Sequence, residues 1–149
     1  MPVSIANAIV HGLQSSSDAL RRVSDALRVV AVVDVAEVAT CARPAAVAAL
    51  WKTNGGQFIV WCASPESANR FANDCTFYLQ AAGSPVYALR PRDSAGAPVN
   101  PSERSDRLTF LELLQTRRAG IYCVSQAAAR QPLADPAEFA SARLRLVVG

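Results

Sequence analysis

Histidine and lysine are almost absent from this chain of 149 residues, which contains one histidine, His11, and one lysine, Lys52. A catalytic triad, a histidine-based zinc site or a histidine general base would have to use His11, in a segment with no other chemical signal. The four cysteines show no C-x-x-C spacing, so we interpret them as free thiols in the core rather than metal ligands or a disulfide. We therefore expect no catalytic residue, no metal and no cofactor.

Long apolar runs and a strong charge of one sign are missing too. No run approaches the roughly 20 apolar residues that span a bilayer, and the first residues lack the pattern of a signal peptide. We expect a cytoplasmic protein with no membrane partner. The net charge of +3 permits nucleic-acid binding without demonstrating it. A composition that is 51% hydrophobic can form a core, and residues 1–149 are predicted to be a single domain.

The clearest pattern is a β-α-β unit. Gln57–Ala63 is a short apolar run, typical of a strand buried on both faces. Ser64 and Pro65 are a helix N-cap and a first helical residue, and apolar residues then recur at helical spacing until Gly83. Val86–Leu89 is the next short strand. The two strands are predicted to be parallel, with a right-handed connection.

A second β-α unit is predicted before this one. Residues 1–33 form two cover helices, the first ended by Gly12 together with 14–17 and the second capped by Asp18. A strand is placed near 35–39, followed by a turn at 40–43 and a helix that Pro44 opens. A nucleotide-binding protein of this architecture would hold phosphate at that turn.

The second half continues the alternation of helix and strand. Residues 90–101 are predicted to be an exposed loop, and a helix then begins at Pro101 or Ser102. Its core side carries Leu108, Leu111 and Leu114. Its last turn carries Arg117 and Arg118. A buried strand, 121–124, leads to Ser125, which caps a short helix. Asp135 begins a second capped turn, and 142–149 alternates like a half-exposed strand or an edge strand. The fold predicted is a three-layer α/β/α domain with a mostly parallel sheet.

Several of these segments resemble the N-terminal region of the bacterial transcription-repair coupling factor. Residues 58–74 are similar to its strand and "TPD-x-x-x-A-x-x-L-x-x-D" helix, and 100–108 resemble its "SP-x-x-x-x-x-x-RL" helix start. Residues 120–133 resemble "G-V-V-V-T-x-x-x-A-L-L-x-x-x-P". The tail resembles the strand that enters the family's next subdomain, which implies that 142–149 lead into a following subdomain. The resemblance covers about 35–149, and the helicase-like component of the bacterial excision nuclease shares this region.

The resemblance implies a helicase-like first subdomain with a degenerate P-loop, in a family whose full-length protein is an ATP-dependent DNA translocase. The residues agree with a lost ATP site, because 38–50 contain no glycine, lysine or serine. The degenerate phosphate-loop position is occupied by Thr40, Cys41, Ala42, Arg43 and Pro44. The implied role is a non-catalytic scaffold in transcription-coupled nucleotide excision repair. Its expected partners are other subdomains of the same factor and the damage-recognition component of excision repair.

Two alternatives stay open. In the first, the chain binds nucleic acid, and its phosphates are held by the helix start at Ser125 and by arginines of the second half. The candidates are Ser125, Gln126, Arg104, Arg107, Arg117, Arg118 and Arg130. Acids interleave with these arginines, so DNA contact is expected to be weak or indirect. In the second, the chain is a small α/β enzyme, against which the scarcity of histidine and lysine counts.

Overall fold

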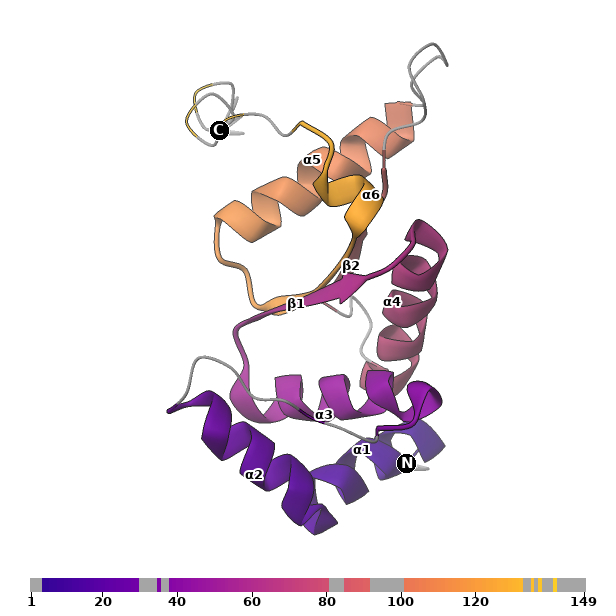
Figure 1. Cartoon of the computed structure of the whole chain (residues 1–149), viewed down its shortest axis with the longest axis vertical. Helices are drawn as coiled ribbons and strands as arrows, with labels where there is room; N and C mark the ends of the chain where they lie inside the picture. The colour runs from indigo at the N-terminus through magenta and orange to yellow at the C-terminus, as the bar shows by residue number, and fades with distance from the viewer. Residues whose placement is uncertain are drawn as a thin grey trace, which may run out of the picture.

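The computed structural model describes residues 4–29, 35, 38–80, 85–91, 101–132, 135, 137 and 141. Its elements are, in chain order, α1 (Ile5–Ser16), α2 (Asp18–Leu27), the 3-10 turn η1 (Thr40–Ala42), α3 (Arg43–Asn54), β1 (Gln57–Cys62), α4 (Pro65–Leu79), β2 (Val86–Leu89), α5 (Pro101–Gln115), β3 (Gly120–Ser125) and α6 (Gln126–Ala129) (Figure 1). The strands form a parallel sheet in the order β1-β3-β2. The α/β class and the parallel sheet are therefore confirmed.

Helices cover both faces of this sheet. The chain passes from β1 over the position of β3 to β2 and then reverses to reach β3. Two right-handed crossovers in opposite directions place their helices on opposite faces. The side chains of β3 alternate accordingly, since Ile121 and Cys123 pack in the core with α4, whereas Tyr122 and Val124 pack with Phe110 of α5.

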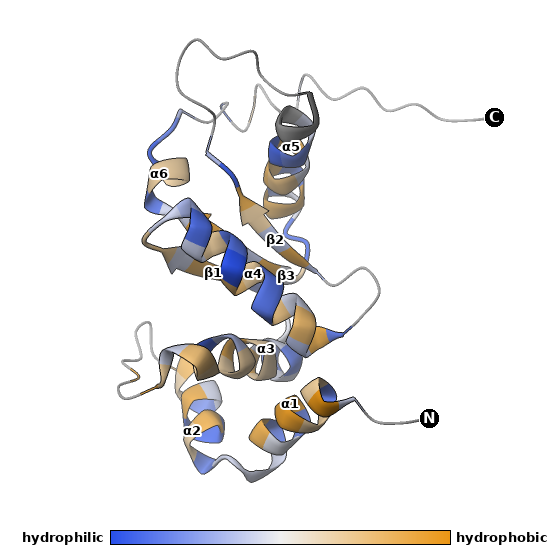
Figure 2. Ribbon diagram, turned by 90° about the vertical axis from the view of Figure 1, so that its right-hand side faces the viewer, coloured by the Kyte–Doolittle hydropathy of each residue, from blue (hydrophilic) through white to orange (hydrophobic). Residues whose placement is uncertain are grey.

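The core on the α4 side extends into a further group of helices. Val10 of α1, Ala48 and Ala49 of α3, and Ala72 and Cys75 of α4 share one buried cluster. These small side chains let α3 and α4 approach closely, and α1 packs against both helices. Figure 2 shows α1, α2 and α3 grouped at one end of the molecule, away from α5 and α6. No helix in the described ranges has the length and hydropathy required to cross a membrane.

Helix α4 begins as predicted. The Ser64 hydroxyl accepts a hydrogen bond from the Ser67 amide at 3.2 Å, and the Ser67 side chain accepts one from the Ser64 amide at 3.0 Å, which forms a capping box. Its end was predicted wrongly, because the helix stops at Leu79 and Gln80 takes the left-handed conformation, with φ of 44°. The predicted stop, Gly83, lies outside the described residues.

The N-terminal helices also differ from the prediction. Helix α1 continues through Gly12 to Ser16, because a glycine lowers helix stability without ending a helix. Ser17, not Asp18, caps α2, and its hydroxyl accepts from the Leu20 amide at 3.3 Å. Val35, Val38 and Ala39 are not in a strand. The second β-α unit is therefore reduced, in the described part of the chain, to a turn and a helix.

The predicted inner face of helix α5 is confirmed in part. Leu111 and Leu114 pack against the buried cluster over β2 and β3, as predicted. Leu108 does not, since it is 42% exposed, whereas Phe110 and Arg107 are buried. The Arg107 Nη1 donates to the Arg90 carbonyl oxygen at 2.9 Å, so the arginine stem lies between α5 and the end of β2. Arg117 and Arg118 follow the helix instead of forming its last turn, and Arg117 has a positive φ of 53°.

The remaining expectations fall at the edges of the described residues. Ser125 caps α6 as predicted, and the Asp135 carboxylate accepts from the Ala137 amide at 2.7 Å, as expected for the second capped turn. Of the loop expected at 90–101, residues 92–100 are outside the description. So is the predicted strand at 142–149.

Candidate functional site

The degenerate phosphate-loop position forms a closed turn. The Ala42 amide donates to the Ala39 carbonyl at 2.8 Å, and Pro44, which has no amide hydrogen, is buried in the first turn of α3. The Arg43 Nε donates to the Val38 carbonyl at 3.2 Å. This turn therefore uses part of its hydrogen-bonding capacity within itself, where a phosphate loop would direct amides at an anion.

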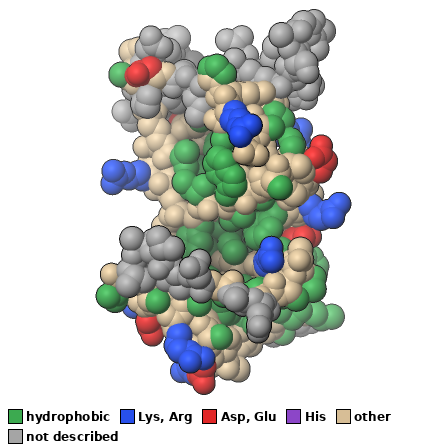
Figure 3. All heavy atoms as spheres, in the orientation of Figure 1, with side chains coloured by type: hydrophobic (Ala, Val, Ile, Leu, Met, Phe, Trp, Pro, Cys, Tyr) green, Lys and Arg blue, Asp and Glu red, His purple; other side chains and the backbone are tan. Residues whose placement is uncertain are grey.

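Beside this turn lies an apolar cavity of about 540 Å³. It opens next to the carboxyl end of β1, and its wall combines side chains of α2, α3 and α4 with those of β1, among them Val23, Val47, Leu50, Val60 and Phe71. Thr40 and Arg43 from the degenerate loop position also line it. Figure 3 shows hydrophobic side chains gathered across the middle of this face, in the region between β1 and α3. We call the cavity of about 540 Å³ the β1 cavity.

Two large apolar side chains of β1 are exposed, and one of them, Trp61, also lines the β1 cavity. Phe58 and Val60 of β1 pack toward the α4 core, and alternation then directs Ile59 and Trp61 to the opposite face. These two side chains are 62% and 63% exposed. The prediction that this strand is buried on both faces was wrong, because α5 and α6 pack over β2 and β3. We refer to Ile59 and Trp61 as the β1 patch.

The predicted nucleic-acid residues do not form one accessible stripe. Arg107 is 7% exposed and packs inside, so it is removed from the set of phosphate contacts. Ser125 is fully buried, and its hydroxyl accepts from the Ala128 amide at 3.1 Å. Gln126, Arg117, Arg118 and Arg130 are exposed, in agreement with the prediction for these positions. The side chain of Arg104 lies outside the description.

Three of the four cysteines are small core residues, as predicted, because Cys62, Cys75 and Cys123 are buried free thiols. The prediction was wrong for Cys41, a free thiol that is exposed. Burial raises the pKa of Cys75 to about 12, with smaller contributions from the Asp74 and Cys62 charges. Burial likewise raises the pKa values of Cys62 and Cys123. Thiols held neutral in this way are poor nucleophiles.

In the described part of the chain, the geometry supports neither a metal site nor histidine chemistry. No group of three or more His, Cys, Asp or Glu residues within it could hold a metal ion. His11 lies on an exposed part of α1.

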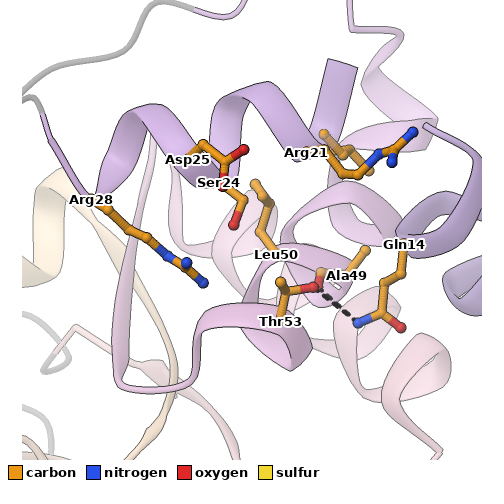
Figure 4. A pocket seen from close by; sticks show the side chains of 9 residues that line it. Gln14, Arg21, Ser24, Asp25, Arg28, Ala49, Leu50 and Thr53 are labelled. Carbon is orange, nitrogen blue, oxygen red and sulfur yellow. Dashed lines mark hydrogen bonds between the residues drawn. The ribbon is translucent and has the colours of Figure 1, made fainter. Parts of the chain in front are cut away.

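A smaller pocket, of about 140 Å³, lies where α1 and α2 meet α3. Figure 4 shows Gln14 and Thr53 directed toward each other across it, and the Gln14 Nε2 donates to the Thr53 Oγ1 at 3.1 Å. Ser24, which also lines it, donates to the Asn54 Oδ1 at 3.0 Å. These hydrogen bonds hold the first two helices to α3, so we interpret this pocket as a packing seam.

Sequence reasoning missed the β1 cavity and the β1 patch. Both depend on which strand edge the helices leave uncovered, and the strand order decides that. The one available signal was Trp61 itself, a large aromatic residue at the end of a short strand. Comparison of the chain with protein-family models, with curated proteins and with solved structures found no match.

Proposed function

We propose that this chain is a non-catalytic, helicase-like interaction domain of a transcription-repair coupling factor, and that it acts as a scaffold in transcription-coupled nucleotide excision repair. The order of the motifs in 58–74, 100–108 and 120–133 supports the family. The parallel α/β sheet is consistent with a helicase-like subdomain. The interaction role rests on the β1 patch.

The β1 patch is the observation that carries the proposal. Ile59 and Trp61 keep more than half of their surface in solvent, on a strand at the edge of the sheet. Burying a large apolar side chain contributes about 1.5–3 kcal/mol, and tryptophan is enriched among the residues that dominate protein interfaces. A second subdomain of the same factor, presenting its own apolar surface, would bury both side chains.

The non-catalytic part of the proposal rests on the degenerate loop position. Binding of a triphosphate needs several free amides and a lysine that reaches the β and γ phosphates. Here Pro44 lacks an amide hydrogen, the Ala42 amide is engaged, and Arg43 lines an apolar cavity. Titration calorimetry with ATP and magnesium should give no heat of binding. A micromolar isotherm that is lost in Arg43→Ala would contradict this part.

The interaction part is tested by binding to purified partners. The Ile59→Ser/Trp61→Ser double variant should lose at least about tenfold in affinity for the remaining subdomains of the factor, or for the damage-recognition component. Phe77→Ser is the matched control, since Phe77 is an apolar side chain of α4 that is 56% exposed and lies outside the patch. Equal affinity of the wild type and the double variant for both partners would reject the patch as the interface.

A further inference from the structure

The β1 cavity has the location and size of a small-molecule site. It lies beside the carboxyl end of a parallel strand, where ligands bind in open α/β sheets. Its volume of about 540 Å³ is within the range of pockets that hold small organic molecules, roughly 300–1,000 Å³. It is also far larger than the packing seam of about 140 Å³. Trp61 of the β1 patch also borders it, whereas the side chains of α2, α3 and α4 that line it have no part in the scaffold role proposed above.

The wall of the cavity favours an apolar ligand body. Val23 of α2, Val47 and Leu50 of α3, Val60 of β1 and Phe71 of α4 present aliphatic and aromatic surface from four different elements. Contact with another apolar group removes this surface from water and so lowers the free energy. A ligand made only of charged and polar groups would leave that surface without a complementary partner.

A single cation gives the cavity its polarity. Arg43 is the one charged residue among the described residues of the lining, which include no acid. Its Nε donates to the Val38 carbonyl at 3.2 Å, and within the described chain the two terminal nitrogens have no hydrogen-bond partner. These nitrogens can donate to both oxygens of one carboxylate. Thr40, which lines the same cavity, adds a hydroxyl close to Arg43 in the chain.

We propose that the β1 cavity binds a small organic carboxylate with an apolar body, of the class of medium-chain fatty acids. The carboxylate pairs with the Arg43 guanidinium, and the chain lies against Val47, Leu50 and Phe71. One cation balances one negative charge, so a monoanion suits the site better than a nucleotide with several phosphates.

Calorimetry with three ligands of equal chain length tests the charge requirement. Decanoate, decanol and decylammonium are titrated separately, the two ions below their micelle concentrations and decanol below its solubility limit. Decanoate should bind about tenfold more tightly than decanol, and decylammonium more weakly than either. The Arg43→Gln variant should lose the preference for decanoate and keep its affinity for decanol. Arg70→Gln is the control, because Arg70 is an exposed arginine of α4 outside the lining, and this variant should match the wild type.

The rate of alkylation of a thiol in the cavity wall is a second measure of ligand binding. Cys62 lines the cavity and is 7% exposed, whereas Cys75 and Cys123 are 0% exposed. In a Cys41→Ala background, saturating decanoate should slow alkylation of Cys62 by iodoacetamide at least about threefold, an effect that Arg43→Gln removes.

Four outcomes would overturn the proposal. They are equal affinities for the three ligands, no binding of decanoate whether or not a protein partner covers the cavity, a preference for decanoate that survives in Arg43→Gln, and a Cys62 that is alkylated in the free protein and reacts at the same rate with saturating decanoate.

Discussion

Gly120 lies at the first residue of β3, directly beside the backbone that precedes β2. A Cβ at this position would lie 2.7 Å from the Pro85 carbonyl oxygen and 3.2 Å from the Tyr87 ring. The same oxygen accepts a 2.7 Å hydrogen bond from the Ile121 amide, so the two strands cannot separate without weakening the ladder. We predict that Gly120→Ala lowers the free energy of unfolding by about 1–3 kcal/mol.

Gly12 provides the opposite case for the same measurement. It lies within α1, and a Cβ there would meet no atom within 4 Å. Because glycine is a poor helix former, Gly12→Ala should raise the free energy of unfolding by about 0.5–1 kcal/mol. Denaturant melts of both variants provide the comparison, and a stable Gly120→Ala protein would mean that the start of β3 is less constrained than its contacts indicate.

The buried cysteines make stability depend on alkaline pH. Burial raises the pKa of Cys75 to about 12 and raises that of Cys123 as well, whereas both thiols titrate near 9.0 when exposed. Above pH 9 the unfolded chain therefore releases protons that the folded chain retains, and the free energy of unfolding falls as the pH rises. Each such thiol contributes a loss of about 1.4 kcal/mol per pH unit in this range.

Urea melts in reducing buffer at about pH 8 and pH 10 measure this effect. The Cys75→Ala variant should show a smaller difference between the two pH values than the wild type, because one titrating thiol is gone. Cys41→Ala is the matched control at an exposed position and should keep the wild-type difference. The same pH dependence in all three proteins would assign it to groups other than the buried thiols.

At the scale of elements, α4 is the helix that joins the sheet to the N-terminal helices, since it packs against β2 and β3 on one side and against α1 and α3 on the other. Its capping box joins Ser64 to Ser67, and its first turn carries Glu66, whose pKa is lowered by a backbone hydrogen bond and by Ser64. Ser64→Ala removes one half of the box and should lower the free energy of unfolding by about 1 kcal/mol.

The other end of α4 should respond in the opposite direction. Gln80 adopts φ of 44°, a left-handed conformation in which glycine has no steric cost. We therefore expect Gln80→Gly to be neutral or to stabilise by up to about 1 kcal/mol. Thermal or chemical melts can be compared directly with those of Ser64→Ala. A clear loss of stability in Gln80→Gly would show that the Gln80 side chain has a role beyond the cap.

The elements themselves were predictable because their signals are local. Ser64-Pro65 begins a helix, Gly55 and Gly56 end one with φ of 65° and 77°, and short apolar runs form β1, β2 and β3. The inner face of α5 was predictable only in part. Helical spacing identified Leu111 and Leu114, but Leu108 and Phe110 are both apolar, and only packing against β2 and β3 selects Phe110 for the core. Arg107 was assigned to the surface by its charge, although its long stem can be buried while one nitrogen bonds the Arg90 carbonyl.

At the scale of the whole molecule, the strand order explains both candidate surfaces. Strand β3 lies between β1 and β2, and the chain returns from β2 through α5 to β3. The buried cluster that includes Phe110 of α5 therefore forms over β2 and β3. Helices α5 and α6 do not cover β1, so the β1 patch stays exposed and the β1 cavity lies open at the carboxyl end of the strand. Strand order results from contacts between residues far apart in the sequence, such as the pairing of Gln57 with Gly120. No local pattern encodes it.

The distribution of charge over the molecule predicts weak binding to DNA. Helix α5 carries three acids, Glu103, Asp106 and Glu112, against Arg104 and Arg107, and Arg107 is buried. The exposed Arg117 and Arg118 lie just after these acids, within a chain whose net charge is +3. Interleaved charges cancel much of the local field that would attract phosphates.

Fluorescence anisotropy with short duplex and single-stranded DNA tests this at about 50 and 200 mM salt, where proteins that neutralise 6–10 phosphates lose roughly 10³–10⁵ in affinity. We expect Kd values weaker than about 10 µM at the lower salt concentration and a shallow dependence on salt. The informative variant is Arg117→Glu/Arg118→Glu, because both arginines are exposed, whereas reversing the charge of the buried Arg107 would disturb the fold itself. Arg22→Glu/Arg28→Glu on and just after α2 applies the same change of charge at exposed positions far along the chain. Submicromolar binding that is lost only in the Arg117/Arg118 variant would favour a nucleic-acid-binding domain over the proposed scaffold. Equal weakening in both double variants would show only the effect of net charge.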